Sequence, residues 1–175
     1  KSFNMIFAID KKGGIGFQNT LPWKYKTDMS YFRKMTLNTK LPNKQNCVIM
    51  GRKTWESCGN LKNRMNIVIT NKEFDKYKNY VFEEDANTLT YFCKTIHDAL
   101  NLADKTNYVD KLWVIGGAQI YKECFRHHKL NKVYITKIDH DFNCDTFLKI
   151  PEMNLIDSNL LKDEFIIDTQ NTNLL

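Results

Sequence analysis

Short apolar runs and segments of helical periodicity alternate along the chain. Each apolar run has the length of a strand, and the runs lie at residues 5–9, 47–50, 66–70, 112–115 and 133–138. The spacing of hydrophobic side chains becomes helical at residues 28–35, at 95–104, where Thr95 is an acceptable N-cap, and at 118–125. Strands that alternate with helices predict an α/β fold with a central, mainly parallel, twisted sheet flanked by helices.

The remaining segments are less regular. Residues 71–79 and 83–90 are polar, which favours loops or a sheet edge. Near the end of the chain, residues 155–160 or 165–168 could supply a strand, and a polar stretch then leads to Leu174 and Leu175. We therefore expect the chain as given to lack its final strand, which would leave the neighbouring strand edge exposed.

Glycine stands between a predicted strand and a predicted helix at two places. Gly116 and Gly117 follow the run at 112–115, and Gly51 follows the run at 47–50. Glycine lets the backbone approach a ligand closely, and the helix that follows offers unpaired N–H groups to a phosphate. A plain tight turn is the alternative at each place. Together, the two junctions predict one extended anionic ligand that is held at two points.

Composition and charge narrow the classes of function. The 175 residues fit one domain, residues 1–175, and the net charge is +6. The basic residues are dispersed, so a nucleic-acid partner is not required, and a small multianionic ligand or a solvated surface explains the charge equally well. No window approaches the roughly 18 apolar residues of a membrane span.

The cysteines and histidines predict the compartment and argue against a metal. The five cysteines form no CxxC pair, which is typical of reduced thiols in the cytoplasm. The four histidines show no metal-ligand spacing, so no metal site is expected.

Asp28 is the sharpest single candidate for chemistry. Its ordinary role at a helix start would be to stabilise the helix dipole. However, Leu21, Pro22 and Trp23 lie just upstream, behind a glycine-rich segment at 13–16, a pattern that predicts a mobile flap. A carboxylate among apolar side chains titrates high, and it suits hydrogen bonding to an amino-pyrimidine edge.

At this point the chain resembles the dihydrofolate reductase family. The motifs occur in family order and with family-like spacing from residue 4 to about residue 147. They are IFA at 6–8, GIG at 14–16, LPW at 21–23, Asp28 with YF at 31–32, NCVIMGRKTWES at 46–57, NRMN at 63–66, IGG at 115–117, Tyr121, Thr136 and DTF at 145–147. Each motif is common by itself, whereas the ordered set is highly specific.

The resemblance implies the reduction of 7,8-dihydrofolate to tetrahydrofolate by NADPH, which supplies one-carbon carriers for thymidylate and purine synthesis. It also implies binding of antifolates such as methotrexate, and in some lineages fusion to thymidylate synthase. The family closes its sheet with a C-terminal antiparallel hairpin, which is expected to be incomplete here.

The resemblance further implies roles on the substrate side. Asp28 is the pterin carboxylate, Trp23 holds a water near it and Thr136 bonds to it; with Tyr121 they form the expected catalytic set. The expected substrate contacts are the backbone carbonyls of Ile6 and Ile115, the arginine that grips the glutamate α-carboxylate, Arg64, and the pocket side chains Phe7, Met29, Phe32, Cys58 and Leu61.

On the cofactor side, the resemblance implies that Gly116 and Gly117, joined by a cis peptide, and the helix after them bind the pyrophosphate. Arg52, with Asn71 or Lys72, meets the 2′-phosphate, whereas Trp55 is expected in the core. The full set of expected cofactor contacts is Ala8, Ile15, Gly51, Arg52, Lys53, Thr54, Thr70, Asn71, Lys72, Gly116, Gly117, Ala118, Gln119, Ile120 and Tyr121. Cys58, Gly59 and Asn71 depart from the family pattern, which leaves inhibitor fit and the second phosphate ligand open.

Two other functions are compatible with this fold. One is the related NADPH-dependent reductase of riboflavin synthesis, against which Asp28, the LPW motif and Arg64 speak. The other is a nucleotide- or nucleic-acid-binding module without catalysis, against which the intact Asp28, Tyr121 and Thr136 speak. Tight binding of methotrexate would select the folate enzyme.

Overall fold

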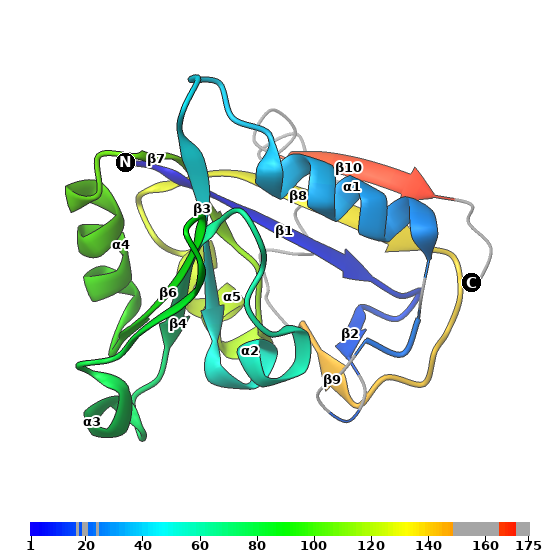
Figure 1. Ribbon diagram of the computed structural model, residues 1–175. Helices are drawn as coiled ribbons and strands as arrows, with labels where there is room; N and C mark the ends of the chain where they lie inside the picture. The colour runs from blue at the N-terminus through cyan, green and yellow to red at the C-terminus, as the bar shows by residue number, and fades with distance from the viewer. Residues whose placement is uncertain (17, 19–20, 24, 149–164, 171–175) are drawn as a thin grey trace.

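One mixed sheet dominates the computed structural model, which describes residues 1–16, 18, 21–23 and 25–148 and the backbone of 165–170. Its eight strands lie in the order β10-β8-β1-β7-β3-β4-β6-β5 (Figure 1). They are β1 (Phe3–Ile9), β3 (Gln45–Gly51), β4 (Met65–Ile69), β5 (Val81–Asp85), β6 (Thr88–Cys93), β7 (Val109–Val114), β8 (Leu130–Ile138) and β10 (Phe165–Gln170). Neighbouring strands run parallel except β5 and β6, so the predicted mainly parallel sheet is confirmed.

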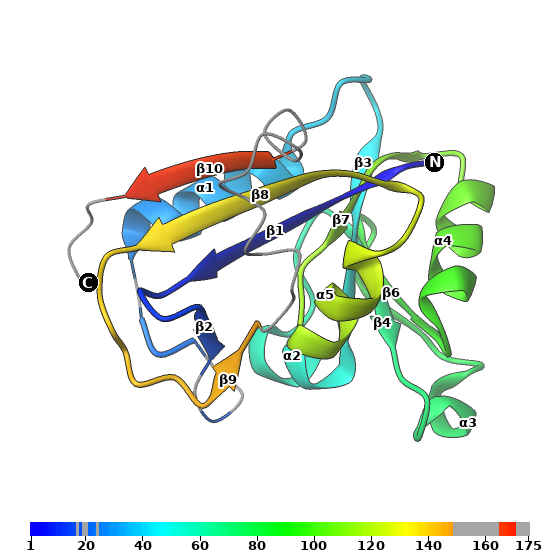
Figure 2. The ribbon, with the colours of Figure 1, turned by 180° about the vertical axis from the view of Figure 1, so that it is seen from behind.

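Helices cover both faces of this sheet. They are α1 (Lys26–Leu37), α2 (Arg52–Cys58), α3 (Phe74–Tyr77), α4 (Ile96–Lys105) and α5 (Ala118–Phe125). Helices α4 and α5 pack on one face, and α1 and α2 pack on the other (Figures 1 and 2). A separate antiparallel ladder joins β2 (Gly14–Gly16) to β9 (Thr146–Phe147).

Alternate residues of each central strand enter different halves of the core. In β3, Cys47 and Ile49 pack with α4 and α5, whereas Val48 and Met50 pack with α1 and α2. Because both faces of the sheet are covered, β1, β3, β4 and β7 each contain at least three consecutive apolar residues. This is why they stand out in the sequence as continuous hydrophobic runs.

Most of the predicted elements are present. The five apolar runs lie in β1, β3, β4, β7 and β8, and the three predicted helices are α1, α4 and α5. Thr95 caps α4, since its hydroxyl accepts a hydrogen bond from the Asp98 N–H at 3.1 Å. Among the described residues, no helix is long and apolar enough to cross a membrane.

The two polar segments were predicted only in part. Residues 71–79 contain the short helix α3, so a loop throughout is wrong. Residues 83–90 include the exposed edge strand β5, as predicted, but also the start of β6, which lies inside the sheet. Thr88 and Thr90 are fully buried there because their hydroxyls hydrogen-bond to the Asn63 N–H and to Asn60. A strand with satisfied buried threonines resembles a loop in sequence.

The C-terminal strand differs from the expected hairpin. A strand at 165–168 is confirmed as β10, but it runs parallel to β8, with Phe165 opposite Val133 and Gln170 opposite Ile138. The long connection between β8 and β10 allows the crossover that a parallel pair requires. Residues 155–160 and the pair Leu174 and Leu175, on which the missing-strand expectation rests, lie outside the described residues.

Candidate active site

The two glycine junctions lie side by side in the structure. Their strands, β3 and β7, are parallel neighbours, so both helices begin at the same edge of the sheet. The Ile115 N–H donates to the Ile49 carbonyl at 2.9 Å, and the Gly51 N–H donates to the Gly116 carbonyl at 2.8 Å. This arrangement is compatible with the sequence hypothesis of one extended anionic ligand held at two points, which stays a prediction.

Gly116 tolerates no side chain at this junction. Its φ of +129° is unfavourable for other residues, and an added Cβ would lie 3.3 Å from the Tyr121 hydroxyl and 3.4 Å from Thr54 Oγ1. The Gly116–Gly117 peptide is cis, as the resemblance implies. The absence of a Cβ therefore leaves room for Tyr121 and Thr54 to pack against the backbone of this junction.

In the part of the chain that the structure describes, no side chain caps or neutralises the N-termini of α2 and α5. Each helix has glycine at its N-cap, no side-chain cap and no acidic residue in its first turn. In contrast, α1, α3 and α4 carry Asp28, Asp75 and Asp98 in their first turns. The first N–H groups of α2 (Arg52, Lys53 and Thr54) and of α5 (Ala118, Gln119 and Ile120) have no partner within their helices. These two ends suit an anion.

Arg52 joins α2 to the segment after β4. Its Nη1 lies 2.8 Å from Glu56 and 3.3 Å from Glu73. Asn71 and Lys72, the predicted phosphate ligands, are exposed on the same segment, whereas Thr70 is buried. Sequence reasoning missed Glu73 because only the fold brings it next to Arg52.

Asp28 lies half-buried in the first turn of α1, as predicted. Burial raises the pKa of its carboxyl group, and a hydrogen bond with Thr136 and the nearby indole of Trp23 partly oppose this rise. Trp23 is buried beside it, and its ring packs against Phe142 at 5.2 Å. Among the described residues, the indole N–H of Trp23 has no partner at hydrogen-bond distance, so its effect on Asp28 acts across a gap. Such a gap suits a bridging water.

Tyr121 connects α5 to β1. Its buried hydroxyl donates to the Ile6 carbonyl at 3.0 Å, and its ring lies 4.9 Å from that of Phe7. Burial raises the pKa of the Tyr121 hydroxyl far above its usual range, so the group stays neutral. Ala8 pairs with Thr136 across β1 and β8 and packs against the cluster that contains Trp23, whereas Ile15, half-buried on β2, packs against the cluster that contains Tyr121.

An apolar cluster lies on the face of the sheet that α1 covers, where Phe32 follows Asp28 by one helical turn. Ile6, Phe32, Leu61 and Ile115 pack in this cluster, whereas Phe7, also expected in the pocket, packs in the other core cluster with Tyr121. Trp55 belongs to the same cluster as Phe32, which confirms its place in the core. Met29, expected in the pocket, is 56% exposed, and the exposed Cys58 places its sulfur 3.9 Å from Met50 Sδ.

Arg64 is a buried cation that lacks an acidic partner among the described residues. It is only 4% exposed, and its Nη1 and Nε donate to Thr36 Oγ1 at 2.8 Å and to the Lys62 carbonyl at 2.9 Å. Burial and the nearby Arg33 lower its pKa to about 10, which still leaves it protonated at neutral pH. A buried charge without a counterion is costly, so this guanidinium fits an anionic ligand. Sequence reasoning missed Thr36, the residue that orients it.

Two further features of this region were not predicted. The Gln18 N–H donates to Asp145 at 2.9 Å, which ties the glycine-rich segment to the DTF motif. Asp10 is buried nearby, at the end of β1.

No group of three or more His, Cys, Asp or Glu side chains among the described residues could hold a metal ion.

A family model and the curated relatives both show similarity to dihydrofolate reductases. The family model for dihydrofolate reductase matches residues 2–173. The chain is 36% identical to a dihydrofolate reductase of Drosophila melanogaster over 149 residues, which cover 83% of this chain and 78% of that protein. For a dihydrofolate reductase of Gallus gallus, identity is 34% over 171 residues, covering 93% and 85% of the two chains. A bifunctional dihydrofolate reductase-thymidylate synthase of Daucus carota is 34% identical over 157 residues, which are 86% of this chain and 28% of that protein.

Proposed function

The chain belongs to the dihydrofolate reductase family, whose reaction is the reduction of dihydrofolate to tetrahydrofolate, and we propose that it carries out this reaction with NADPH. The observation that carries the proposal is the pairing of an anion-binding edge at α2 and α5 with a half-buried carboxylate at Asp28. When bound, NADPH supplies the hydride. Positioning and electrostatics are then the tasks of the protein.

We assign the pterin to the space between Asp28 and the apolar cluster that contains Phe32. The anion of Asp28 pairs with the amino-pyrimidine edge and favours protonation of the pterin. Thr136 and Trp23 keep the carboxylate ionised and oriented, because both favour its charged form. We assign the Ile6 and Ile115 carbonyls to the same edge, and the hydrogen bond from Tyr121 supports a fixed position for the Ile6 carbonyl.

The anionic groups of NADPH and dihydrofolate are assigned to different parts of the protein. The N-termini of α2 and α5, next to Gly51, Gly116 and Gly117, suit the pyrophosphate. Arg52 suits the 2′-phosphate, and Arg64 suits the glutamate carboxylate of the substrate through a bidentate fork. Arg64 supports this assignment because it is buried and preoriented by Thr36.

Purified protein is expected to oxidise NADPH only when dihydrofolate is present, and methotrexate is expected to inhibit it. The loss of absorbance of the reduced cofactor measures this directly. A protein that binds neither ligand would refute the proposed function. A protein that binds NADPH but turns over a riboflavin precursor instead would select the related reductase.

Arg52→Ala is expected to weaken NADPH binding about tenfold or more and NADH binding very little, because only NADPH carries the 2′-phosphate. Glu73→Gln is expected to strengthen NADPH binding, since Glu73 competes with the phosphate for Arg52. Dissociation constants for both cofactors test this pair. Arg126→Ala, at the C-terminal end of α5, is the matched control. Equal losses for NADPH and NADH would show that Arg52 does not distinguish them.

The setting of the enzyme is also proposed rather than established. The five cysteines are all free thiols, which supports a reducing compartment such as the cytoplasm. The bifunctional relatives raise fusion to thymidylate synthase as a hypothesis. A transcript that continues the reading frame into a synthase domain would establish it.

A further inference from the structure

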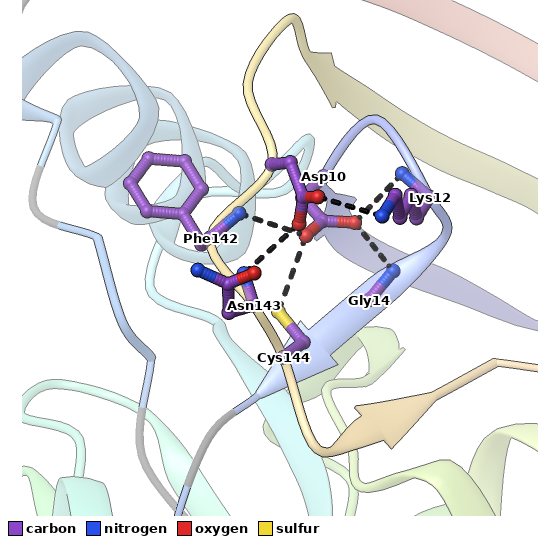
Figure 3. Close-up of polar contacts among 7 residues, drawn as sticks. Asp10, Lys12, Gly14, Phe142, Asn143 and Cys144 are labelled. Atoms are coloured by element: carbon purple, nitrogen blue, oxygen red, sulfur yellow. Dashed lines mark hydrogen bonds and ion pairs between the residues drawn. The ribbon is translucent and has the colours of Figure 1, made fainter.

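A buried carboxylate that the proposed reaction does not use lies at the end of β1. Asp10 is 3% exposed, and the only other charged side chain that is as thoroughly buried among the described residues is Arg64. Figure 3 shows that Asp10 stands at the centre of a group of polar contacts. A buried carboxylate is expensive unless donors surround it, so its partners indicate its purpose.

Asp10 bridges two segments that are distant in the sequence. Its Oδ1 accepts hydrogen bonds from the backbone N–H groups of Lys12 and Gly14, at 2.9 and 2.7 Å. Its Oδ2 accepts from the Phe142 N–H at 3.2 Å and from the Cys144 thiol at 3.4 Å. The ammonium group of Lys12 pairs instead with Asp141 at 2.9 Å. Backbone dipoles and a thiol, rather than a cation, therefore stabilise the Asp10 carboxylate (Figure 3).

Each of these segments leads to a wall of the proposed active site. Gly14 begins β2, which carries Ile15, and the Phe142 ring packs on Trp23 at 5.2 Å. The two segments pack closely, because a Cβ on Gly14 would lie 2.4 Å from the Cβ of Cys144. Asp10 thus fixes at once the strand beside the cofactor position and the ring that supports Trp23.

We propose that Asp10 is a positioning residue for the reduction of dihydrofolate, which holds Ile15 and Trp23 in their catalytic positions by joining residues 12–14 to residues 142–144. The proposal rests on the proposed function. Asp10 does not touch either ligand, and it acts through the backbone that carries those two side chains. Small displacements of such groups reduce the rate of a reaction more than they reduce binding.

Asp10→Asn separates the two halves of this contact. The amide oxygen still accepts from one segment, but its NH₂ group meets the donors of the other. We expect the single-turnover rate of hydride transfer to fall about tenfold, by loss of positioning. The dissociation constants for dihydrofolate and methotrexate should change far less, since the Arg64 end of the substrate site is untouched.

Three further variants keep the test decisive. Asp110→Asn is the matched control, because Asp110 also ties a loop to a strand by accepting from the Lys40 and Leu41 N–H groups, away from this site. It should lower the melting temperature without slowing hydride transfer. Should Asp10→Asn not fold, Cys144→Ala compared with Cys144→Ser decides the matter, since serine keeps a donor to Asp10 and alanine does not.

The outcomes are distinct. A slower single turnover in Asp10→Asn, or in Cys144→Ala but not Cys144→Ser, supports the positioning role. A folded Asp10→Asn with an unchanged single-turnover rate overturns it and leaves Asp10 with a structural role only. Failure of the proposed function would show itself separately, as absence of dihydrofolate-dependent NADPH oxidation in the unmodified protein.

Discussion

Asp28→Asn is expected to lower the turnover of dihydrofolate on the order of 10²-fold or more at neutral pH, in line with the loss of a group that assists proton transfer. The substitution keeps the size of the side chain and removes its charge. An amide cannot stabilise a protonated pterin as the carboxylate can. Cofactor binding should be almost unchanged, because the anion-binding edge at α2 and α5 is built from other residues.

The loss should depend on pH with a definite sign. At neutral and high pH little dihydrofolate is protonated in solution, so the variant lacks the step that Asp28 assists. At low pH the solvent supplies protonated substrate, and part of the rate should return. Turnover measured against pH for both proteins tests this. A loss that is uniform across pH, or no loss at all, would be incompatible with the role given to Asp28.

The melting temperature separates misfolding from loss of the carboxylate as the cause of this loss. Burial raises the folded-state pKa of Asp28 above its ordinary value of 3.8, so the protein loses stability as pH rises through that window. At neutral pH the ionised Asp28 therefore costs stability, and Asp28→Asn removes that cost. The melting temperature of the variant should equal or exceed that of the parent protein. Glu84→Gln, on the exposed strand β5, is a control for the change of charge alone.

The central sheet could be predicted because its strands are buried on both faces. Such strands contain unbroken apolar runs in the sequence, as β1, β3, β4 and β7 do, whereas in β8 Thr136 and Lys137 interrupt the run. Strand β6 could not be found in the same way. Its buried threonines are polar in sequence, and only the fold provides the hydrogen-bond partners that buried hydroxyl groups require.

The same distinction applies to the site. Glycine after a strand is a local signal, so the junctions at Gly51 and Gly116 were predicted, and the parallel pairing of β3 with β7 brings them together. The partners of charged groups are not local. Glu73 beside Arg52, Thr36 beside Arg64 and the segment at 142–144 beside Asp10 depend on contacts between distant parts of the chain.

Arg64→Leu is expected to raise the Michaelis constant for dihydrofolate about 10²-fold, since the loss of one partner of a buried charge pair costs about 3 kcal/mol. Turnover should change much less, because this contact is remote from the hydride and binds ground state and transition state alike. Steady-state kinetics over a wide range of substrate concentration measure both quantities. Arg64→Lys should lie between, since lysine keeps the charge and loses the fork.

A substrate analogue without the glutamate moiety sharpens this test. The parent protein and Arg64→Leu should reduce the analogue with the same Michaelis constant, because neither then has a carboxylate to bind. A difference that persists with the analogue would mean that the substitution distorts the pterin site. A large fall in turnover with unchanged Michaelis constant would contradict the assignment of Arg64 altogether.

Arg64→Leu should change substrate binding without lowering thermal stability. The guanidinium is buried, its pKa is lowered to about 10 by that burial, and no acidic partner offsets it among the described residues. Replacing such a cation by an apolar side chain of similar reach is commonly neutral or stabilising. Thr36 keeps its own bond to the Phe32 carbonyl at 2.8 Å, and the Lys62 carbonyl is the acceptor that loses its Arg64 donor. Arg64→Leu should therefore bind substrate poorly while melting no earlier than the parent, and a variant that loses both together would place Arg64 in the scaffold rather than in the substrate site.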